Sequence, residues 1–223
     1  MPHSPSVTGL GIGHLPILHE NILKSQALFD FVEVTPESYI GGDPELALAQ
    51  LEDITAAFEV TCHGIDLSFA SADPVNLDHL IAARGITNSC NASFFSEHMA
   101  YTKAGELNAD RFFTKVATQA DNGIILNIDS ISISARLQGI NPLDLVAAYP
   151  PDRVVSLTVV PESCMNPIIR QICGGFDKDM LSIVQHCLNH TAAQSVLVQT
   201  RYAENTVDSL SEIINSLRSL LCK

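Results

Sequence analysis

Strand-like and helix-like segments alternate along this chain of 223 residues, and the alternation predicts an α/β fold, a TIM-barrel-like parallel β/α barrel. Two further observations favour this class. Several strand-like segments are continuous apolar runs, which is typical of parallel strands buried on both faces. Histidines and carboxylates follow some of these runs directly, at the strand ends where β/α barrels carry their active sites.

Apolar runs and flanking turns predict strands at residues 7–13, 31–34, 59–63, 90–95, 123–128, 153–160 and 195–199. Apolar residues at helical spacing predict helices at residues 21–29, 44–58, 74–84, 109–120, 142–148, 177–190 and 207–221. An eight-stranded barrel typically takes about 250 residues. This barrel is therefore expected to be shortened by about one βα unit.

Turn and cap residues define the ends of several elements. Asp43 or Gly42 is expected to cap a helix that has Pro44 at its first position, and Gly85 is expected to end the next helix.

The first strand carries the pattern G-x-G-x-G, which resembles a nucleotide-binding loop, but Pro16 interrupts the helix that such a loop requires. These glycines are therefore interpreted as points of bending or close backbone approach.

Composition excludes several classes of function. With a net charge of −13 and only 12 Lys and Arg, the chain has no basic face for nucleic acid. No apolar run is long enough to span a membrane, and the first residues show no secretory signal, so we expect a cytoplasmic protein. Its hydrophobic content of 46% is enough for one large core, which predicts a single domain over residues 1–223.

The six cysteines form no C-x-x-C pair and are expected to be free thiols in a reducing compartment. Cys62 stands beside His63 and could be a thiolate ligand. Because side chains alternate along a strand, the favoured interpretation places Cys62 on the opposite face, in the core.

Titratable residues stand at or near the ends of different predicted strands, namely Glu33, His63 and His98. Imidazole and carboxylate together suit iron, zinc or manganese, so a metal site is one interpretation. The alternative for each residue is a buried polar group held by hydrogen bonds, or a surface position at a strand end. Their common position at the carboxyl ends of strands supports the metal site.

Three sequence blocks carry a resemblance to a known family. FVEVTPESY at residues 31–39 resembles its "EV-x-x-EN-Y" block, HGIDLSFAS at 63–71 resembles its "HGVGLSLGS" loop, and SEHMAY at 96–101 resembles its "SEHLAW" block. This is the family of multinuclear non-heme iron-dependent oxidases, which includes the methanobactin biosynthesis enzymes. Two weaker likenesses follow, LNIDS at 126–130 to "LDVNN" and GINP at 139–142 to "G-x-DP".

The resemblance implies a barrel that binds iron and uses dioxygen to oxidise cysteine or other residues of a ribosomally made precursor peptide. In the family a partner protein often delivers the peptide. The resemblance also implies that His63 and His98 are metal ligands. Glu97, which precedes His98 in the same block, would either bind the metal or orient His98.

Other positions depart from the family. Its metal-bridging glutamate has no match here, and Asn127, Thr158 and Gln199 stand where the family carries an aspartate, a histidine and a glutamate. Because neutral amides cannot offset the charge of several iron ions, we expect one ion rather than a full multinuclear centre. The expected metal ligands are His63, His98, Glu97 and Asp129, and the expected pocket residues are Glu33, Glu37, Asn127, Thr158 and Gln199.

Two functions remain open from the sequence. The chain is either a reduced iron oxidase that acts on a peptide, or a catalytically inactive pseudoenzyme that binds a peptide or partner protein in the same cleft. Sugar-isomerase-like and endonuclease-like barrels also place His and Glu around metals. The three sequence blocks argue against a sugar isomerase, and the acidic net charge argues against an endonuclease. A barrel that does not close would expose strand edges, which a homodimer could cover.

Overall fold

The computed structural model of the protein describes residues 7–41, 43–67, 74–98, 115–165, 176–200 and 207–222. The chain forms two compact units. We call Ile12–Glu106 the N-terminal unit, and Met1–Gly11 with Leu107–Lys223 the C-terminal unit. Strand β1 (Gly9–His14) crosses the boundary, so each unit contains part of it. The single domain predicted over residues 1–223 stays a prediction.

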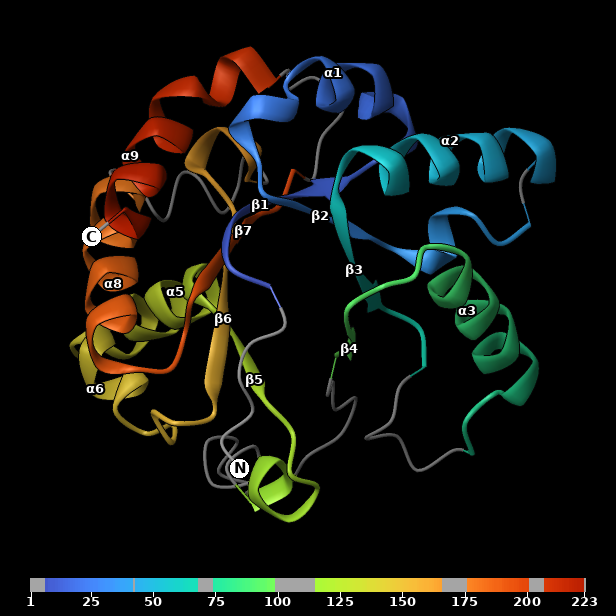
Figure 1. Cartoon of the computed structure of the whole chain (residues 1–223). Helices are drawn as coiled ribbons and strands as arrows, with labels where there is room; N and C mark the ends of the chain where they lie inside the picture. The colour runs from blue at the N-terminus through green and yellow to red at the C-terminus, as the bar shows by residue number, and fades with distance from the viewer. Residues whose placement is uncertain are drawn as a thin grey trace. The chain divides into compact units, whose positions relative to one another are not determined.

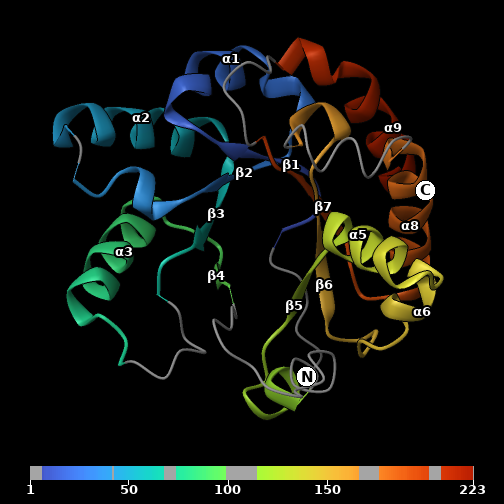
Figure 2. The same ribbon diagram turned by 180° about the vertical axis from the view of Figure 1, so that it is seen from behind.

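The N-terminal unit is a parallel α/β layer with strands in the order β1-β2-β3-β4. After β1 come β2 (Phe31–Val34), β3 (Glu59–Gly64) and β4 (Phe95–Glu97). Its helices are α1 (His19–Lys24), α2 (Pro44–Ala57) and α3 (Leu77–Ser89), with 3-10 turns η1 (Pro16–Leu18), η2 (Gln26–Leu28) and η3 (Pro36–Ser38). Both views of the ribbon show α2 and α3 on the same side of β2, β3 and β4 (Figures 1 and 2).

Helix caps explain where α2 and α3 begin. The Asp43 carboxylate accepts hydrogen bonds from the backbone N–H groups of Glu45 and Leu46, which confirms the predicted cap of α2. Asn76 caps α3 in the same way, so this helix starts three residues later than predicted. The prediction that Gly85 ends α3 is wrong, because the helix continues through Gly85 to Ser89.

The C-terminal unit has the strand order β1-β7-β6-β5, with β5 (Ile124–Asn127), β6 (Val154–Val159) and β7 (Ser195–Val198). Its helices are α5 (Ile128–Gln138), α6 (Pro142–Val146), α8 (Phe176–His190) and α9 (Ser211–Leu221), with 3-10 turns η4 (Glu162–Cys164) and η5 (Val207–Leu210). Of the helix predicted over 109–120, residues 109–114 lie outside the described residues, and 115–119 are helical. Helix α5 was not predicted.

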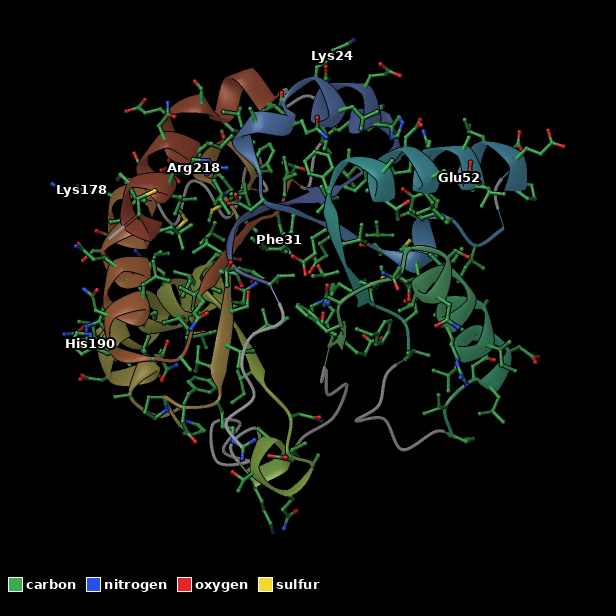
Figure 3. All side chains as sticks on the ribbon, in the orientation of Figure 1. Lys24, Phe31, Glu52, Lys178, His190 and Arg218 are labelled. Atoms are coloured by element: carbon green, nitrogen blue, oxygen red, sulfur yellow. The ribbon has the colours of Figure 1, made fainter. Side chains whose placement is uncertain are left out.

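Each unit has its own apolar core. In the N-terminal unit the fully buried side chains include Ile12, Val32 and Ile54, and in the C-terminal unit they include Leu157, Val196 and Leu217. Figure 3 shows Phe31 of β2 in the interior, whereas the charged side chains of Lys24 and Glu52 lie on the outside of the helices. Among the described residues, no helix is both long and apolar enough to cross a membrane.

Candidate metal site

Two imidazoles meet at the carboxyl ends of β3 and β4. His63 is the fifth residue of β3 and pairs in register with Ser96 of β4, and His98 directly follows β4. The Nε2 atoms of His63 and His98 lie 3.1 Å apart, with ring centroids 4.6 Å apart and planes at 79°. Two nitrogens that bind one ion at about 2.0–2.1 Å must lie within about 4.2 Å of each other, so this pair fits a shared ion.

Ser96 determines which nitrogen of His63 carries a proton. The Ser96 hydroxyl donates to the carbonyl oxygen of Cys62 at 3.3 Å, so it accepts a hydrogen bond from Nδ1–H of His63 at 2.9 Å. With the proton on Nδ1, the Nε2 lone pair of His63 accepts a hydrogen bond from Nε2–H of His98 at 3.1 Å. Burial, with the charge of His98, lowers the pKa of His63 from 6.5 to about 4, so the ring is neutral at pH 7.

Glu97 is held by backbone groups. Its Oε1 accepts from its neighbour His98 N–H at 2.7 Å, and its Oε2 accepts from Leu67 N–H at 3.3 Å. Burial raises the pKa of Glu97, and these two hydrogen bonds offset only part of that effect. A side chain at Gly64 would place its Cβ 2.5 Å from Glu97 Oε2. In this geometry Glu97 fixes the segment after β3 and the backbone of His98.

Glu37 and His79 form a second pair at the same end of the N-terminal unit. Glu37, in η3 after β2, accepts hydrogen bonds at Oε1 from Ile65 N–H and from Nε2 of His79, each at 3.1 Å. Glu37 was expected to be a pocket residue, whereas His79 was not among the expected site residues. No local pattern marks His79, because it reaches Glu37 from α3, 42 residues further along the chain.

Register places Glu33 on the face that carries His63. Glu33 of β2 pairs with Thr61 of β3, and paired residues of parallel strands face the same side, as do Thr61 and His63 two residues apart. Glu33 and Thr61 are both buried. Cys62 faces the other way and is fully buried, as expected from the alternation of side chains.

A buried polar chain in the N-terminal unit was not anticipated. The Tyr39 hydroxyl lies 2.6 Å from Nδ1 of His14, Nε2 of His14 lies 3.2 Å from Nδ1 of His19, and Nε2 of His19 lies 3.3 Å from Oδ2 of Asp53. One set of protons satisfies every link, with each group donating toward Asp53. This chain ties β1, α1 and α2 to the segment after β2.

The remaining predicted site residues lie in the C-terminal unit. Thr158 is a buried residue of β6 in register with Asn127 of β5, and Gln199 follows β7. The strand predicted over residues 123–128 stops at Asn127, so Asp129 does not follow the end of a strand as that prediction implied. The side chain of Asn127 accepts the Ser130 N–H at 2.7 Å and so begins α5, which puts Asp129 in the first turn of that helix. A role for these four residues in metal or peptide binding stays a prediction.

Within the described residues, no three His, Cys, Asp or Glu side chains are grouped closely enough to hold an ion. The preorganised donors are therefore the two imidazoles of His63 and His98. Parts of the resembling blocks, at residues 68–71 and 99–101, lie outside the described residues.

Comparison with known proteins finds matches at two levels of similarity. Residues 9–111 match the family described as the RiPP precursor modification enzymes MbnB/TglH/ChrH. A UPF0276 protein of Acaryochloris marina is 25% identical, with 67% of this chain and 71% of that protein covered. A UPF0276 protein of Haemophilus influenzae is 33% identical, with 42% of this chain and 31% of that protein covered.

Among solved structures, orotidine 5'-monophosphate decarboxylase from Metallosphaera sedula aligns with a TM-score of 0.50 and 14% identity. The alignment covers 96% of this chain and 99% of that one. At this identity the likeness concerns the fold alone, and it confirms the predicted TIM-barrel-like α/β class.

Proposed function

Since this chain belongs, through residues 9–111, to the family of RiPP precursor modification enzymes MbnB/TglH/ChrH, we propose that it modifies a ribosomally made precursor peptide with one iron ion bound at His63 and His98. The family is one of metal-dependent, non-heme iron enzymes. The observation that carries the proposal is the 3.1 Å separation between the Nε2 atoms of the two rings.

The local chemistry supports this role for the pair. Ser96 keeps the proton of His63 on Nδ1, so Nε2 carries no proton and a metal can replace the hydrogen bond that this atom accepts from His98. A metal binds only the neutral imidazole. Glu97 fixes the backbone of His98, so the second ring is anchored next to the first. When bound, the iron would supply the redox chemistry, while these residues hold and orient it.

Metal content tests this proposal directly. Protein loaded anaerobically with Fe²⁺ and then desalted should retain about one equivalent, measured by elemental analysis, and His63→Ala or His98→Ala should lose it. His190→Ala is the matched control, because His190 is an exposed histidine of the other unit. Less than a tenth of an equivalent in the unmodified protein, unchanged in His63→Ala, would overturn the proposal.

A second function, a catalytically inactive peptide-binding relative, is favoured by one specific observation. Asn127 stands where the family carries a ligand, and its side-chain oxygen is already used to cap α5. Oxygen consumption separates the two functions. An enzyme should consume dioxygen when iron and a cysteine-containing precursor peptide are both present, whereas an inactive relative should bind the peptide without consumption.

A cytoplasmic location is also part of the proposal. Five of the six cysteines lie among the described residues, and all five are free thiols. Free thiols are usual in a reducing compartment. Reduced iron and unmodified peptide cysteines are both maintained under such conditions.

A further inference from the structure

One oxygen of Glu37 makes no hydrogen bond within the part of the chain that the structure describes. Oε1 of Glu37 is held by Ile65 N–H and by His79. Oε2 is buried and has no hydrogen-bond partner among the residues that the structure describes. The side chain as a whole is only 10% exposed. Buried polar atoms without partners are rare, and each calls for an explanation such as an ion or a ligand.

This oxygen carries negative charge at neutral pH. Burial raises the pKa of Glu37, but hydrogen bonds from its own backbone N–H, from Ile65 and from His79 together lower it below its usual range. Lys24 and Arg84 are the lysine and arginine in the described part of the N-terminal unit, and Lys24 is paired with Glu20. A desolvated carboxylate is costly unless a cation neutralises it.

Glu37 lies at the same end of the N-terminal unit as the imidazole pair of His63 and His98. Ile65, whose N–H binds Glu37, is two residues beyond His63 on the chain. Strand β2, which leads into η3 and Glu37, pairs with β3 from Phe31 with Glu59 to Val34 with Cys62, the residue before His63. Glu37 and His63 therefore lie at the same end of two neighbouring strands.

We propose that Oε2 of Glu37 is the carboxylate ligand that completes the His63–His98 site, and that His79 positions it by holding Oε1. Two histidines and one carboxylate form a typical ligand set for non-heme Fe(II). The set supplies the negative charge that two neutral imidazoles lack. Because no three donors converge among the described residues, the three side chains must draw closer together when the ion binds. This inference rests on the proposed function.

Glu97 is not an equivalent choice. Both of its oxygens already accept backbone hydrogen bonds, and moving them would release the segment after β3 and the backbone of His98. Glu37 can offer Oε2 while Oε1 keeps its two donors. A histidine that holds a ligating carboxylate in place typically changes metal affinity by about 10- to 100-fold when it is removed.

Cobalt titration tests the proposal without relying on activity. Co²⁺ is the probe, and its visible absorption reports both affinity and the ligand set. His186 and His190 of α8 have rings 4.3 Å apart, and Figure 3 shows His190 on the outer side of α8. All variants therefore carry His186→Ala, which removes this surface pair from the titration.

The decisive variant is Glu37→Gln, compared with Glu59→Gln. Glu59 is an exposed residue at the opposite end of β3, so the two substitutions change net charge equally. Glu37→Gln should weaken Co²⁺ binding at least about 10-fold and change the absorption bands, whereas Glu59→Gln should do neither. His79→Ala should weaken binding about 10- to 100-fold, and His79→Gln, which keeps an N–H donor, should restore most of it.

The outcomes separate this inference from the proposed function. Loss of binding in His63→Ala with unchanged binding in Glu37→Gln would overturn the role of Glu37 and leave the metal site intact. Equal weakening in Glu37→Gln and Glu59→Gln would also overturn it, as an effect of net charge. No Co²⁺ binding in the parent protein would overturn both proposals. Circular dichroism verifies that each variant folds. If Glu37→Gln does not fold, the Co²⁺ affinities of His79→Ala and His79→Gln decide whether Glu37 is a ligand.

Discussion

The hydroxyl of Ser96 accepts a hydrogen bond from Nδ1–H of His63 at 2.9 Å, and the Nε2 lone pair of His63 therefore faces the ring of His98. Register explains this contact, because His63 and Ser96 are paired residues of neighbouring parallel strands. The sheet itself, rather than a loop, selects the tautomer. A ligand whose proton position is fixed by the fold is ready to bind metal without rearrangement.

Ser96→Ala should therefore weaken metal binding although it removes no ligand. Without the acceptor, the Nδ1 proton of His63 is no longer fixed, and the affinity for Fe²⁺ or Co²⁺ should fall about 10- to 100-fold. Competition with a chromophoric chelator measures this change. Ser93→Ala is the matched control, since Ser93 lies before β4 and bonds Glu59 rather than His63. Equal affinities in the two variants would contradict the prediction.

Substitution by alanine should lower the free energy of unfolding at Gly64 and raise it at Gly85. In Gly64→Ala the new Cβ would lie 2.5 Å from Oε2 of Glu97 and 2.7 Å from the Phe95 ring. The Glu97 carboxylate must then move off the N–H groups that it binds, at a cost of about 1–3 kcal/mol. In Gly85→Ala the Cβ meets nothing within 4 Å inside α3, and the helix should gain about 0.5–1 kcal/mol.

Urea denaturation of the two glycine variants and the parent protein measures both effects. Gly64→Ala should lower the free energy of unfolding, and Gly85→Ala should raise it. Metal affinity gives a second readout, since the Glu97 shift also disturbs the backbone of His98. A Gly64→Ala protein as stable as the parent would show that the Glu97 contact is not a constraint.

The strands of the N-terminal unit could be predicted from the sequence more closely than the side-chain contacts of its candidate site. Apolar runs identified β2 to the residue and β3 to within one residue of its end. Gly85 was expected to end α3, but a glycine terminates a helix only where it adopts positive φ, and Gly85 is not among the residues that do. Asn76 and Ser89 therefore mark the ends of α3.

Long-range contacts account for what the sequence did not reveal. The Glu37–His79 pair joins residues 42 positions apart, and no periodic pattern in the sequence indicates such a contact.

Helix α5 was not predicted, because its alternating Ile and Ser residues are weak helix formers. Burial of Ile128, Ile131 and Ala135 along one side of α5, at spacings of three and four residues, outweighs that preference.

Stability should fall as pH is lowered from 6.5 toward 4, and His14 is one of two histidines, with His63, whose pKa is lowered by burial and which cause the fall. Burial, with the charge of His19, lowers the pKa of His14 from 6.5 to about 4 in the folded protein. Between these values the unfolded chain takes up a proton that the folded chain does not, so the free energy of unfolding decreases with decreasing pH. The full shift corresponds to about 3 kcal/mol, and the loss levels off below pH 4.

Denaturation at pH 7, 5.5 and 4.5 measures this dependence. His14→Gln should be less stable at pH 7, because Tyr39 and His19 lose a partner, yet it should lose less stability as pH falls. His190→Gln, at an exposed histidine, should keep the slope of the parent protein. Parallel slopes for His14→Gln and the parent would show that His14 is not one of the groups responsible.

Asn127 should act as a helix cap rather than as a metal ligand. Its side-chain oxygen accepts the Ser130 N–H at 2.7 Å and begins α5. Asn127→Ala should therefore cost about 1 kcal/mol of stability. Asn127→Asp should cost almost nothing, because aspartate is an equally good cap. Neither substitution should change the amount of iron that the protein retains.

Denaturation and elemental analysis of the same samples separate the two roles of Asn127. Asn141→Ala is the matched control, since Asn141 caps α6 through the Leu143 N–H and should show the same loss of stability with the same iron content. Should Asn127→Ala lose iron while keeping its stability, the capping role would be secondary. Iron retention would then depend on the Asn127 side chain itself.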